Sequence, residues 1–323
     1  MSIRRLLVVA TVLAVCGGAL AGAAVPPATV VATINVGRGA GVPAVDASTV
    51  WVPLTKLGSI ARVDVARKRV VATIKLGAPP RFTGYLDAAV LAGGSVWVAR
   101  DVGDEVDRID PETNKLVARI KVDSRPGGLA AGGGYVWAFH FLGPYLTRID
   151  ETTGDKRVFT IDRAAGTGIA VDGGAVWLLT ANPSSVIKID PASGKVLARI
   201  PLKPPQPPKH GIVDTWWMAA GGGSLWVAIA NYDQAARVDE ATAKVKAYVP
   251  VPVQIPFGAA VYKGSAWIAG ESKVVRIDPA ANQVAGVVTL SRSRAVFTQV
   301  AAGPSGLWAT DYDTGKLYRL RVP

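Results

Sequence analysis

The chain contains only two histidines, His140 and His210, and both fall where a loop is expected to begin or run. A histidine can move protons near neutral pH, or bind a metal through its neutral imidazole. Asp214 and Glu271 are carboxylates that could complete such a set. The four residues are therefore a candidate catalytic group. The opposing interpretation, two surface or hydrogen-bonded histidines, is favoured by residue type alone.

A second group of residues has side chains suited to ligand contact. Arg81 and Arg125 precede expected first strands, where a guanidinium could hold a carboxylate or phosphate. Trp216 and Tyr232 add aromatic surface, and Trp216 stands beside Trp217 outside the tryptophan repeat described next. One of these two tryptophans should pack and the other could stack on a ligand. Solvated loop charge explains the arginines equally well.

Seven tryptophans recur in one short apolar sequence, and their spacing predicts the fold. The steps between them are 46, 40, 40, 49, 41 and 41 residues. A period of about 40–50 residues is what four short strands and their turns require in a β-propeller blade. The repeated residues are Trp51, Trp97, Trp137, Trp177, Trp226, Trp267 and Trp308. We predict an all-β, seven-bladed β-propeller with four-stranded antiparallel blades and these side chains in its core.

Each repeat can be divided into four strands. In the third repeat, small residues at 126–131 form the innermost strand and a Gly-Gly-Gly turn leads to the tryptophan strand. Residues 146–149 and 156–161 form the third and fourth strands. An aspartate ends most third strands, where its side chain can accept a backbone N–H two residues on. These predicted turn formers are Asp64, Asp110, Asp150, Asp190, Asp239 and Asp278.

The two ends of the repeat region are complementary. The last repeat ends after three strands, whereas residues 30–36 resemble the fourth strand at 70–76. We predict that the N-terminal strand completes the last blade, because this closes the ring and protects the sheet edges. The propeller is then one domain, residues 25–323.

Residues 1–24 have the pattern of a secretory signal peptide. Arg4 and Arg5 precede an apolar stretch, and small residues at 19–23 offer cleavage sites. We therefore expect an exported protein, periplasmic or secreted, with no membrane span in the mature chain. Two less favoured alternatives are an uncleaved anchor and lipid attachment at Cys16. Because Cys16 is the only cysteine, the mature chain has no disulfide and no thiol chemistry.

The formal net charge of +12 favours anionic partners, either a small anionic ligand or an envelope component. The basic residues are spread over the repeats, as on an ordinary solvated surface. Nucleic acid is compatible with the charge, although the chain lacks a run of interleaved basic and aromatic residues. A glycine-rich phosphate loop, a serine-nucleophile motif and a zinc helix motif are also absent from the sequence.

The repeat motifs resemble a known family. Val-Trp-Val at 50–52, Arg-Ile-Asp-Pro-x-Thr at 108–113 and Val-x-Ala-x-Ile at 70–74 resemble the YVTN repeats of YncE-like propellers. Pro-x-Gly-x-Ala at 126–130 and 256–260 is similar to repeats of streptogramin (virginiamycin B) lyases. The resemblance covers about residues 28–323. It implies a propeller that is either an exported binding protein or a lyase with a metal-dependent histidine and glutamate site.

Function is expected on the loops, because the shared motifs are structural. The favoured hypothesis is a monomeric, non-catalytic propeller that needs no cofactor and binds a ligand or partner through Arg81, Arg125, Trp216 and Tyr232. The alternative is a metal-dependent lyase or lactone hydrolase. In that case His140, His210, Asp214 and Glu271 would act with a divalent metal such as Mg²⁺ or Ca²⁺.

Overall fold

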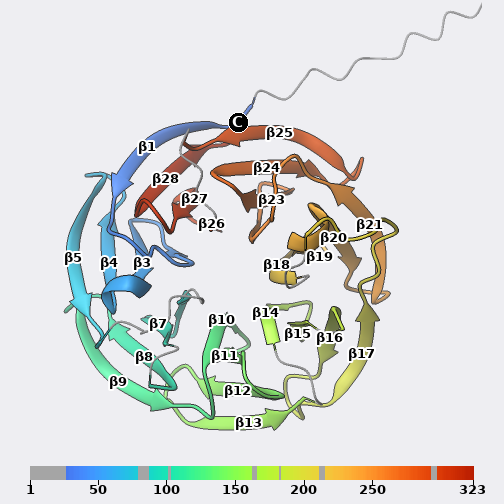
Figure 1. Cartoon of the computed structure of the whole chain (residues 1–323). Helices are drawn as coiled ribbons and strands as arrows, with labels where there is room; N and C mark the ends of the chain where they lie inside the picture. The colour runs from blue at the N-terminus through green and yellow to red at the C-terminus, as the bar shows by residue number, and fades with distance from the viewer. Residues whose placement is uncertain are drawn as a thin grey trace, which may run out of the picture.

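Seven four-stranded antiparallel sheets surround a central axis in a computed structural model of the chain (Figure 1). The structure describes residues 27–78, 87–100, 103–161, 166–181, 183–210, 215–291 and 297–323. The expected signal segment, Arg81 and Asp214 lie outside these residues. Within the described part of the chain, no helix is long and apolar enough to cross a membrane.

The first four blades follow the chain, and each runs from the axis outward. Blade 1 holds β2 (Ala44–Val45), β3 (Thr49–Leu54), β4 (Ser59–Asp64) and β5 (Arg69–Lys75). Blade 2 holds β6 (Ala89–Ala92), β7 (Ser95–Arg100), β8 (Glu105–Asp110) and β9 (Lys115–Lys121). Blade 3 holds β10 (Pro126–Gly132), β11 (Tyr135–His140), β12 (Tyr145–Asp150) and β13 (Lys156–Thr160). Blade 4 holds β14 (Gly166–Asp172), β15 (Ala175–Thr180), β16 (Ser185–Ile189) and β17 (Val196–Pro201).

Blades 5 to 7 continue the ring, and the last one joins the two chain ends. Blade 5 holds β18 (Thr215–Gly221), β19 (Ser224–Ile229), β20 (Gln234–Asp239) and β21 (Lys244–Pro250). Blade 6 holds β22 (Gly258–Tyr262), β23 (Ser265–Gly270), β24 (Lys273–Asp278) and β25 (Gln283–Thr289). Blade 7 holds β26 (Thr298–Gly303), β27 (Gly306–Asp311), β28 (Lys316–Arg321) and β1 (Thr29–Asn35). Two short 3₁₀ helices, η1 (Thr55–Leu57) and η2 (Ala230–Tyr232), follow the second strands of blades 1 and 5.

The predicted closure of the ring is confirmed. Strand β1 pairs antiparallel with β28, so that Thr29 lies opposite Arg321 and Asn35 opposite Lys316. The outermost strand of the last blade is thus the first strand of the chain. Backbone hydrogen bonds join the two ends of the ring, and no exposed first or last blade remains.

The repeated tryptophans form the core between blades, as predicted. Each is at most 1% exposed. Every one belongs to an apolar cluster that also contains residues of the following blade; Trp177, for example, packs with Leu225 and Val227 of blade 5. Trp308 closes the cycle by packing with Val50 and Val52 of blade 1. The tryptophans therefore stabilise the contacts between blades by burying a large apolar area.

A basic residue on the third strand lies over the tryptophan of its own blade in all seven blades. The cation is 4.9 Å from the ring centroid for Lys188 over Trp177 and 5.9 Å for Arg276 over Trp267. Several of these cations also donate to the next blade: Arg148 Nη1 donates to the carbonyl oxygen of Pro191 over 3.0 Å. The Arg-Ile-Asp motif therefore supplies an inter-blade contact as well as the turn expected from the sequence.

The aspartates that end third strands form turns, as expected. Asp150 accepts the backbone N–H groups of Thr152 and Thr153 over 2.9 and 2.8 Å. These hydrogen bonds hold the pKa of Asp150 below its ordinary value, because they stabilise the ionised carboxylate. Gly154 takes the left-handed conformation that the turn requires, with φ of +81°.

Candidate functional site

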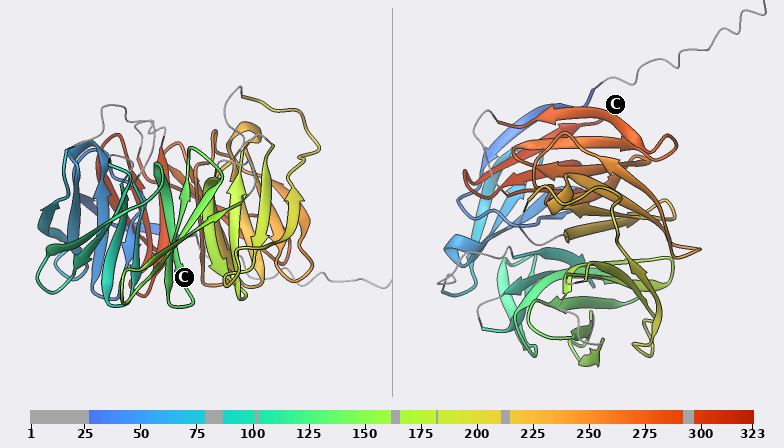
Figure 2. Two further views of the ribbon diagram at one scale, coloured as in Figure 1. Left: turned by 90° about the horizontal axis from the view of Figure 1, so that it is seen from below. Right: turned by 45° about the vertical axis from the view of Figure 1, so that its right-hand side comes forward.

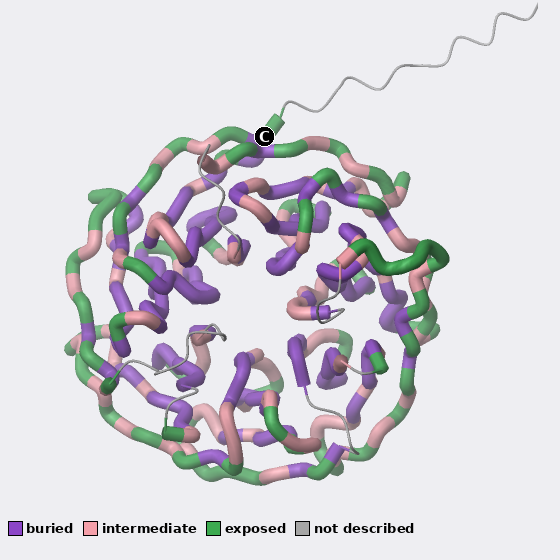
Figure 3. Tube along the Cα trace, in the orientation of Figure 1, coloured by how far each residue is buried: buried purple, intermediate pink, exposed green. Residues whose placement is uncertain are grey.

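One face of the ring carries the loops after the second strands together with the segments that cross between blades. The longest described excursion, residues 202–210, stands out from this loop-rich face (Figure 2) and is largely exposed (Figure 3). Its far end is fastened to η2, because Lys209 N donates to Asn231 O over 2.8 Å. This excursion lies within the 49-residue step between Trp177 and Trp226.

Four aromatic side chains form a continuous arc on the loop-rich face, which we call the aromatic arc. Trp216 lies against Phe257 with ring centroids 4.9 Å apart, and Phe257 meets Phe297 at 4.9 Å in an edge-to-face contact. Phe297 meets Tyr312 at 5.9 Å, and Lys56 Nζ lies 4.5 Å from the Tyr312 ring centroid. The arc thus joins blades 5, 6 and 7 to η1 of blade 1.

The position of each arc residue follows from the blade geometry. Trp216 belongs to β18, the innermost strand of blade 5 (Figure 1). Phe257 and Phe297 immediately precede the innermost strands β22 and β26, and Tyr312 follows β27. Phe257 and Tyr312 are buried at 3% and 2% exposure, whereas Trp216 and Phe297 remain partly exposed. The arc therefore presents aromatic surface beside the axis over a buried aromatic support.

Trp217 points into a different aromatic group. Its ring lies 6.4 Å from that of Phe139, on blade 3. This close approach requires glycine at several positions of the innermost strands. A Cβ on Gly128 would lie 3.1 Å from the Trp217 ring, and one on Gly166 would lie 2.8 Å from Phe139. Trp217 thus packs across blade 4, while Trp216 belongs to the aromatic arc. Both tryptophans are partly exposed and both contact other aromatic rings, so a ligand contact of either one stays a prediction.

His140 is fully buried, and both of its ring nitrogens have partners. Nδ1 contacts the carbonyl oxygen of Ser124, so it must carry the proton and donate. Nε2 therefore accepts from the hydroxyl of Thr147 over 2.8 Å. Burial lowers the pKa of His140 and keeps the ring neutral. His140 ties the segment that enters blade 3 to strands β11 and β12.

His210 has a different set of partners. Its Nε2 lies 3.0 Å from Oδ1 of Asp233, and Lys209 Nζ lies 3.4 Å from Oδ2 of the same carboxylate. Asp233 Oδ1 also accepts the backbone N–H of Ile255 over 3.0 Å. Asp233 has a left-handed backbone, with φ of +51°, at the end of η2. The carboxylate therefore joins the tip of the long loop to the crossing between blades 5 and 6.

Glu271 lies in the same region as this ion pair. Together with Lys209, Asp233 and Lys273 it lines an open cleft of about 340 Å³ between blades 5 and 6. Two carboxylates and two ammonium groups thus face one space, which reduces its attraction for a cation. Among the described residues, no group of three or more His, Cys, Asp or Glu side chains could hold a metal ion. Asp214, the remaining expected ligand, lies outside those residues.

The expected ligand-binding residues occupy separate places on the loop-rich face. Arg125 is partly buried in the crossing before β10, and its backbone N–H donates to Asp104 Oδ1 over 2.7 Å. Tyr232 ends η2 and packs against the apolar cluster of blades 4 and 5. Trp216 is the one of the three that belongs to the aromatic arc.

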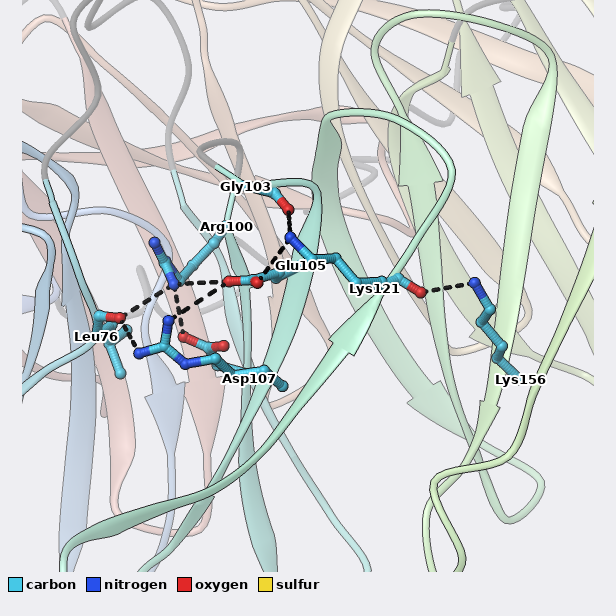
Figure 4. A network of polar contacts seen from close by, with 8 residues as sticks. Leu76, Arg100, Gly103, Glu105, Asp107, Lys121 and Lys156 are labelled. Carbon is cyan, nitrogen blue, oxygen red and sulfur yellow. Dashed lines mark hydrogen bonds and ion pairs between the residues drawn. The ribbon is translucent and has the colours of Figure 1, made fainter.

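A buried charged cluster in blade 2 was not expected from the sequence. Arg100 Nη1 lies 3.0 Å from Glu105 Oε2, 3.3 Å from Asp107 Oδ2 and 3.0 Å from Leu76 O (Figure 4). Asp107 is completely buried, and its Oδ1 has no hydrogen-bond partner among the described residues. Burial raises the pKa of Asp107 to about 6, and the Arg100 guanidinium opposes this rise. Through the hydrogen bond to Leu76 O, the cluster binds the segment that crosses from blade 1 to blade 2.

Two basic residues on the outermost strand of blade 2 complete the cluster. Arg119 Nη2 donates to Leu76 O over 2.6 Å, and Lys121 Nζ lies 2.9 Å from Glu105 Oε1. A sequence signal for the cluster existed. Asp107 occupies a strand position at which other repeats have Ala61, Ile187 or Ala236. A charge at a buried repeat position indicates a paired charge within the fold.

Comparisons with known proteins show the fold. A solved structure described as a streptogramin B lyase has a TM-score of 0.74 at 16% identity, covering 88% of this chain and 94% of that chain. The hydrazine synthase of Kuenenia stuttgartiensis has a TM-score of 0.69 at 16% identity, covering 88% and 96%. No family model matches the chain, and no curated protein matches it. The likeness supports the propeller, and YncE-like membership stays a prediction.

Proposed function

We propose that this protein is an exported, non-catalytic propeller that binds a planar aromatic anion at the aromatic arc of its loop-rich face. The observation that carries the proposal is the aromatic arc. Trp216 and Phe297 are partly exposed, and both contact the buried ring of Phe257. A preformed aromatic surface binds a flat ligand with little ordering cost.

Charge supports an anionic ligand. The ammonium group of Lys56 ends the arc over the Tyr312 ring and is only partly exposed. A carboxylate or sulfonate on a stacked ring could approach this ammonium with a charge-assisted hydrogen bond. The chain carries 36 basic against 24 acidic residues, so the long-range field also attracts anions.

Isothermal titration calorimetry with naphthalene-2-sulfonate tests the proposal, with neutral naphthalene-2-methanol as the comparison ligand. Trp216→Ala should weaken binding of both by about fivefold, because a lost stacking contact is worth about 1 kcal/mol. Lys56→Met should weaken binding of the sulfonate alone. Leu142→Ala is the matched control, since Leu142 is 53% exposed on the loop after β11 and outside the arc.

Two results would contradict this function. One is equal sulfonate affinity in the wild type, Trp216→Ala and Lys56→Met. The other is a loss of affinity that Leu142→Ala reproduces. Thermal melting of each variant shows whether the ring is intact, so that a folding defect is not read as a binding defect.

The metal-dependent lyase or hydrolase is the second candidate function. Support for it comes from the fold likeness and from the cleft where Asp233, the partner of His210, faces Glu271. The described side chains do not form a metal-binding set, so this function would depend on residues such as Asp214 outside them. Elemental analysis after incubation with Mg²⁺, Ca²⁺ and Zn²⁺ decides between the two. Stoichiometric metal that is lost in His210→Ala would favour the enzyme.

A further inference from the structure

The outermost strands of the blades form the cylindrical wall of the ring (Figure 1). Each pairs with one inner neighbour, and its side chains alternate between partly buried and exposed (Figure 3). In β9, for example, Lys115, Val117, Arg119 and Lys121 are exposed while the residues between them are half-buried. Residues two apart on such a strand point the same way, about 7 Å from each other.

Charge on this wall has one sign. The outermost strands of blades 1 to 5, namely β5, β9, β13, β17 and β21, contain ten basic residues and no acidic residue. All ten are exposed: Arg69, Lys75, Lys115, Arg119, Lys121, Lys156, Arg157, Arg199, Lys244 and Lys246. The outermost strands of blades 6 and 7, β25 and β1, contain neither charge. We call the five charged strands the basic wall.

The basic wall holds most of the excess charge of the protein. The chain has 36 basic and 24 acidic residues, so without these ten the excess would fall to two. Some of the ten contact carboxylates at strand ends: Arg119 and Lys121 share Glu105, and Lys246 lies against Asp239. Aspartates in the turns before the wall strands also lie beside wall cations: Asp64, Asp110 and Asp239 stand opposite Arg69, Lys115 and Lys244 in the strand pairing. The wall strands themselves carry no carboxylate, so anions are attracted to them.

The shape of the wall selects the kind of partner. It is convex and extends over five consecutive blades (Figure 1). A flat lipid surface could touch only a sector of such a cylinder, whereas a flexible chain can follow all five blades. The exposed large apolar side chains of the basic wall are aliphatic, Val71, Val117 and Leu197. Without an exposed ring to stack a base, contact would depend on backbone charge.

We propose that the basic wall is a docking surface for a flexible linear polyanion that carries phosphate groups along its backbone. Binding is driven by the release of counterions from the polymer when lysine and arginine side chains neutralise its phosphates. The wall strands contain none of the residues of the aromatic arc, so the inference stands independently of the proposed small-molecule ligand.

The test is fluorescence anisotropy with fluorescein-labelled inorganic polyphosphate, measured as a function of KCl concentration. The wall variant combines Arg69→Gln, Lys115→Gln and Lys244→Gln, one exposed cation on each of three blades. Each lost phosphate contact should reduce the slope of log K against log salt by about 0.7, so three lost contacts should reduce it by about two. Affinity at low salt should fall at least tenfold.

A matched variant controls for net charge alone. Arg38→Gln, Lys203→Gln and Lys209→Gln remove three exposed cations that lie in loops outside the wall strands. This control should keep a salt slope close to that of the wild type. Equal losses in the two variants would overturn the proposal, because they would show a response to net charge and not to the wall. An absence of polyphosphate binding by the wild type at low salt would also overturn it.

Two further measurements test whether the phosphate groups belong to a nucleic acid and whether the partner is a membrane. Oligo-deoxythymidine of equal charge should bind no more tightly than polyphosphate. An affinity more than tenfold higher would mean that the protein recognises bases, and would contradict binding through backbone charge alone. Co-sedimentation with phosphatidylglycerol vesicles, without polymer binding, would assign the wall to a membrane and refute the proposal. The substituted side chains are exposed, so melting temperatures should be unchanged.

Discussion

Replacing Asp107 by asparagine should remove a pH dependence of stability that the buried cluster of blade 2 creates. The pKa of Asp107 rises from 3.8 to about 6 on folding, because burial penalises the ionised carboxylate more than Arg100 stabilises it. Arg119 and Lys121 face the cluster from β9, and Glu105 faces it from β8. This difference between the pKa values of Asp107 in the unfolded and folded states corresponds to about 3 kcal/mol in the free energy of unfolding.

The sign of the effect follows from proton binding. Between pH 3.8 and about 6 the native protein holds a proton on Asp107 that the unfolded chain has lost. The contribution to the free energy of unfolding is therefore complete below pH 3.8, and it is lost as the pH rises through 6. The wild-type protein should lose about 3 kcal/mol relative to Asp107→Asn over this interval.

Urea unfolding at constant ionic strength, from pH 4 to 7.5, measures this difference. Both proteins retain His140 and the turn aspartates, so those titrations cancel when one free energy of unfolding is subtracted from the other. A difference that stays constant with pH would refute the reasoning, since it would mean that Asp107 titrates normally in the folded ring. A difference that grows in the opposite direction would show that the pair with Arg100 outweighs burial.

Other predictions concern the contacts between blades and the channel. Arg237→Met should lower the free energy of unfolding by about 1–3 kcal/mol, because its guanidinium donates to two acceptors in the turn of blade 6; an unchanged urea midpoint would contradict this role. His140→Ala should lower the free energy of unfolding by about 2–4 kcal/mol. The wild type should lose stability as the pH falls below 6.5, because only the unfolded chain then binds a proton at this residue, and the variant should not show this loss. Gly166→Ala should lower the free energy of unfolding by about 1–3 kcal/mol, because the added methyl group would meet the Phe139 ring. Gly286→Ala should not destabilise the protein, because the space around its Cβ position is open. Equal melting temperatures of the two variants would contradict close packing of Gly166 against Phe139.

Much of the fold could be predicted because its signals are local and periodic. The position of Trp97 within its strand follows from repetition, and the turn at Asp150 follows from the hydrogen bonds of one side chain to its own backbone. Ring closure was also predictable, because residues 30–36 have the sequence of a missing fourth strand. Such features need no knowledge of which residues from distant repeats meet.

The candidate site was less predictable, because its contacts join residues far apart in sequence. The carboxylate that holds His210 belongs to Asp233, 23 residues away in the sequence and outside the expected catalytic group. The aromatic arc unites Lys56 with Tyr312, residues from opposite ends of the chain. The buried environment of His140 also depends on Ser124 and Thr147 as they lie in the folded blade.

The amino-acid sequence by itself determined the number of blades, their strand order and the closure of the ring, because repetition and turn chemistry act within about 40 residues. Only the tertiary structure decided which side chains gather. Basic residues such as Arg69, Lys115 and Lys244 appear scattered along the chain, yet the rotation of each blade about the axis brings them onto one wall. The same rotation turns Trp216 toward Phe257 and Trp217 toward Phe139, although the two tryptophans are adjacent in sequence.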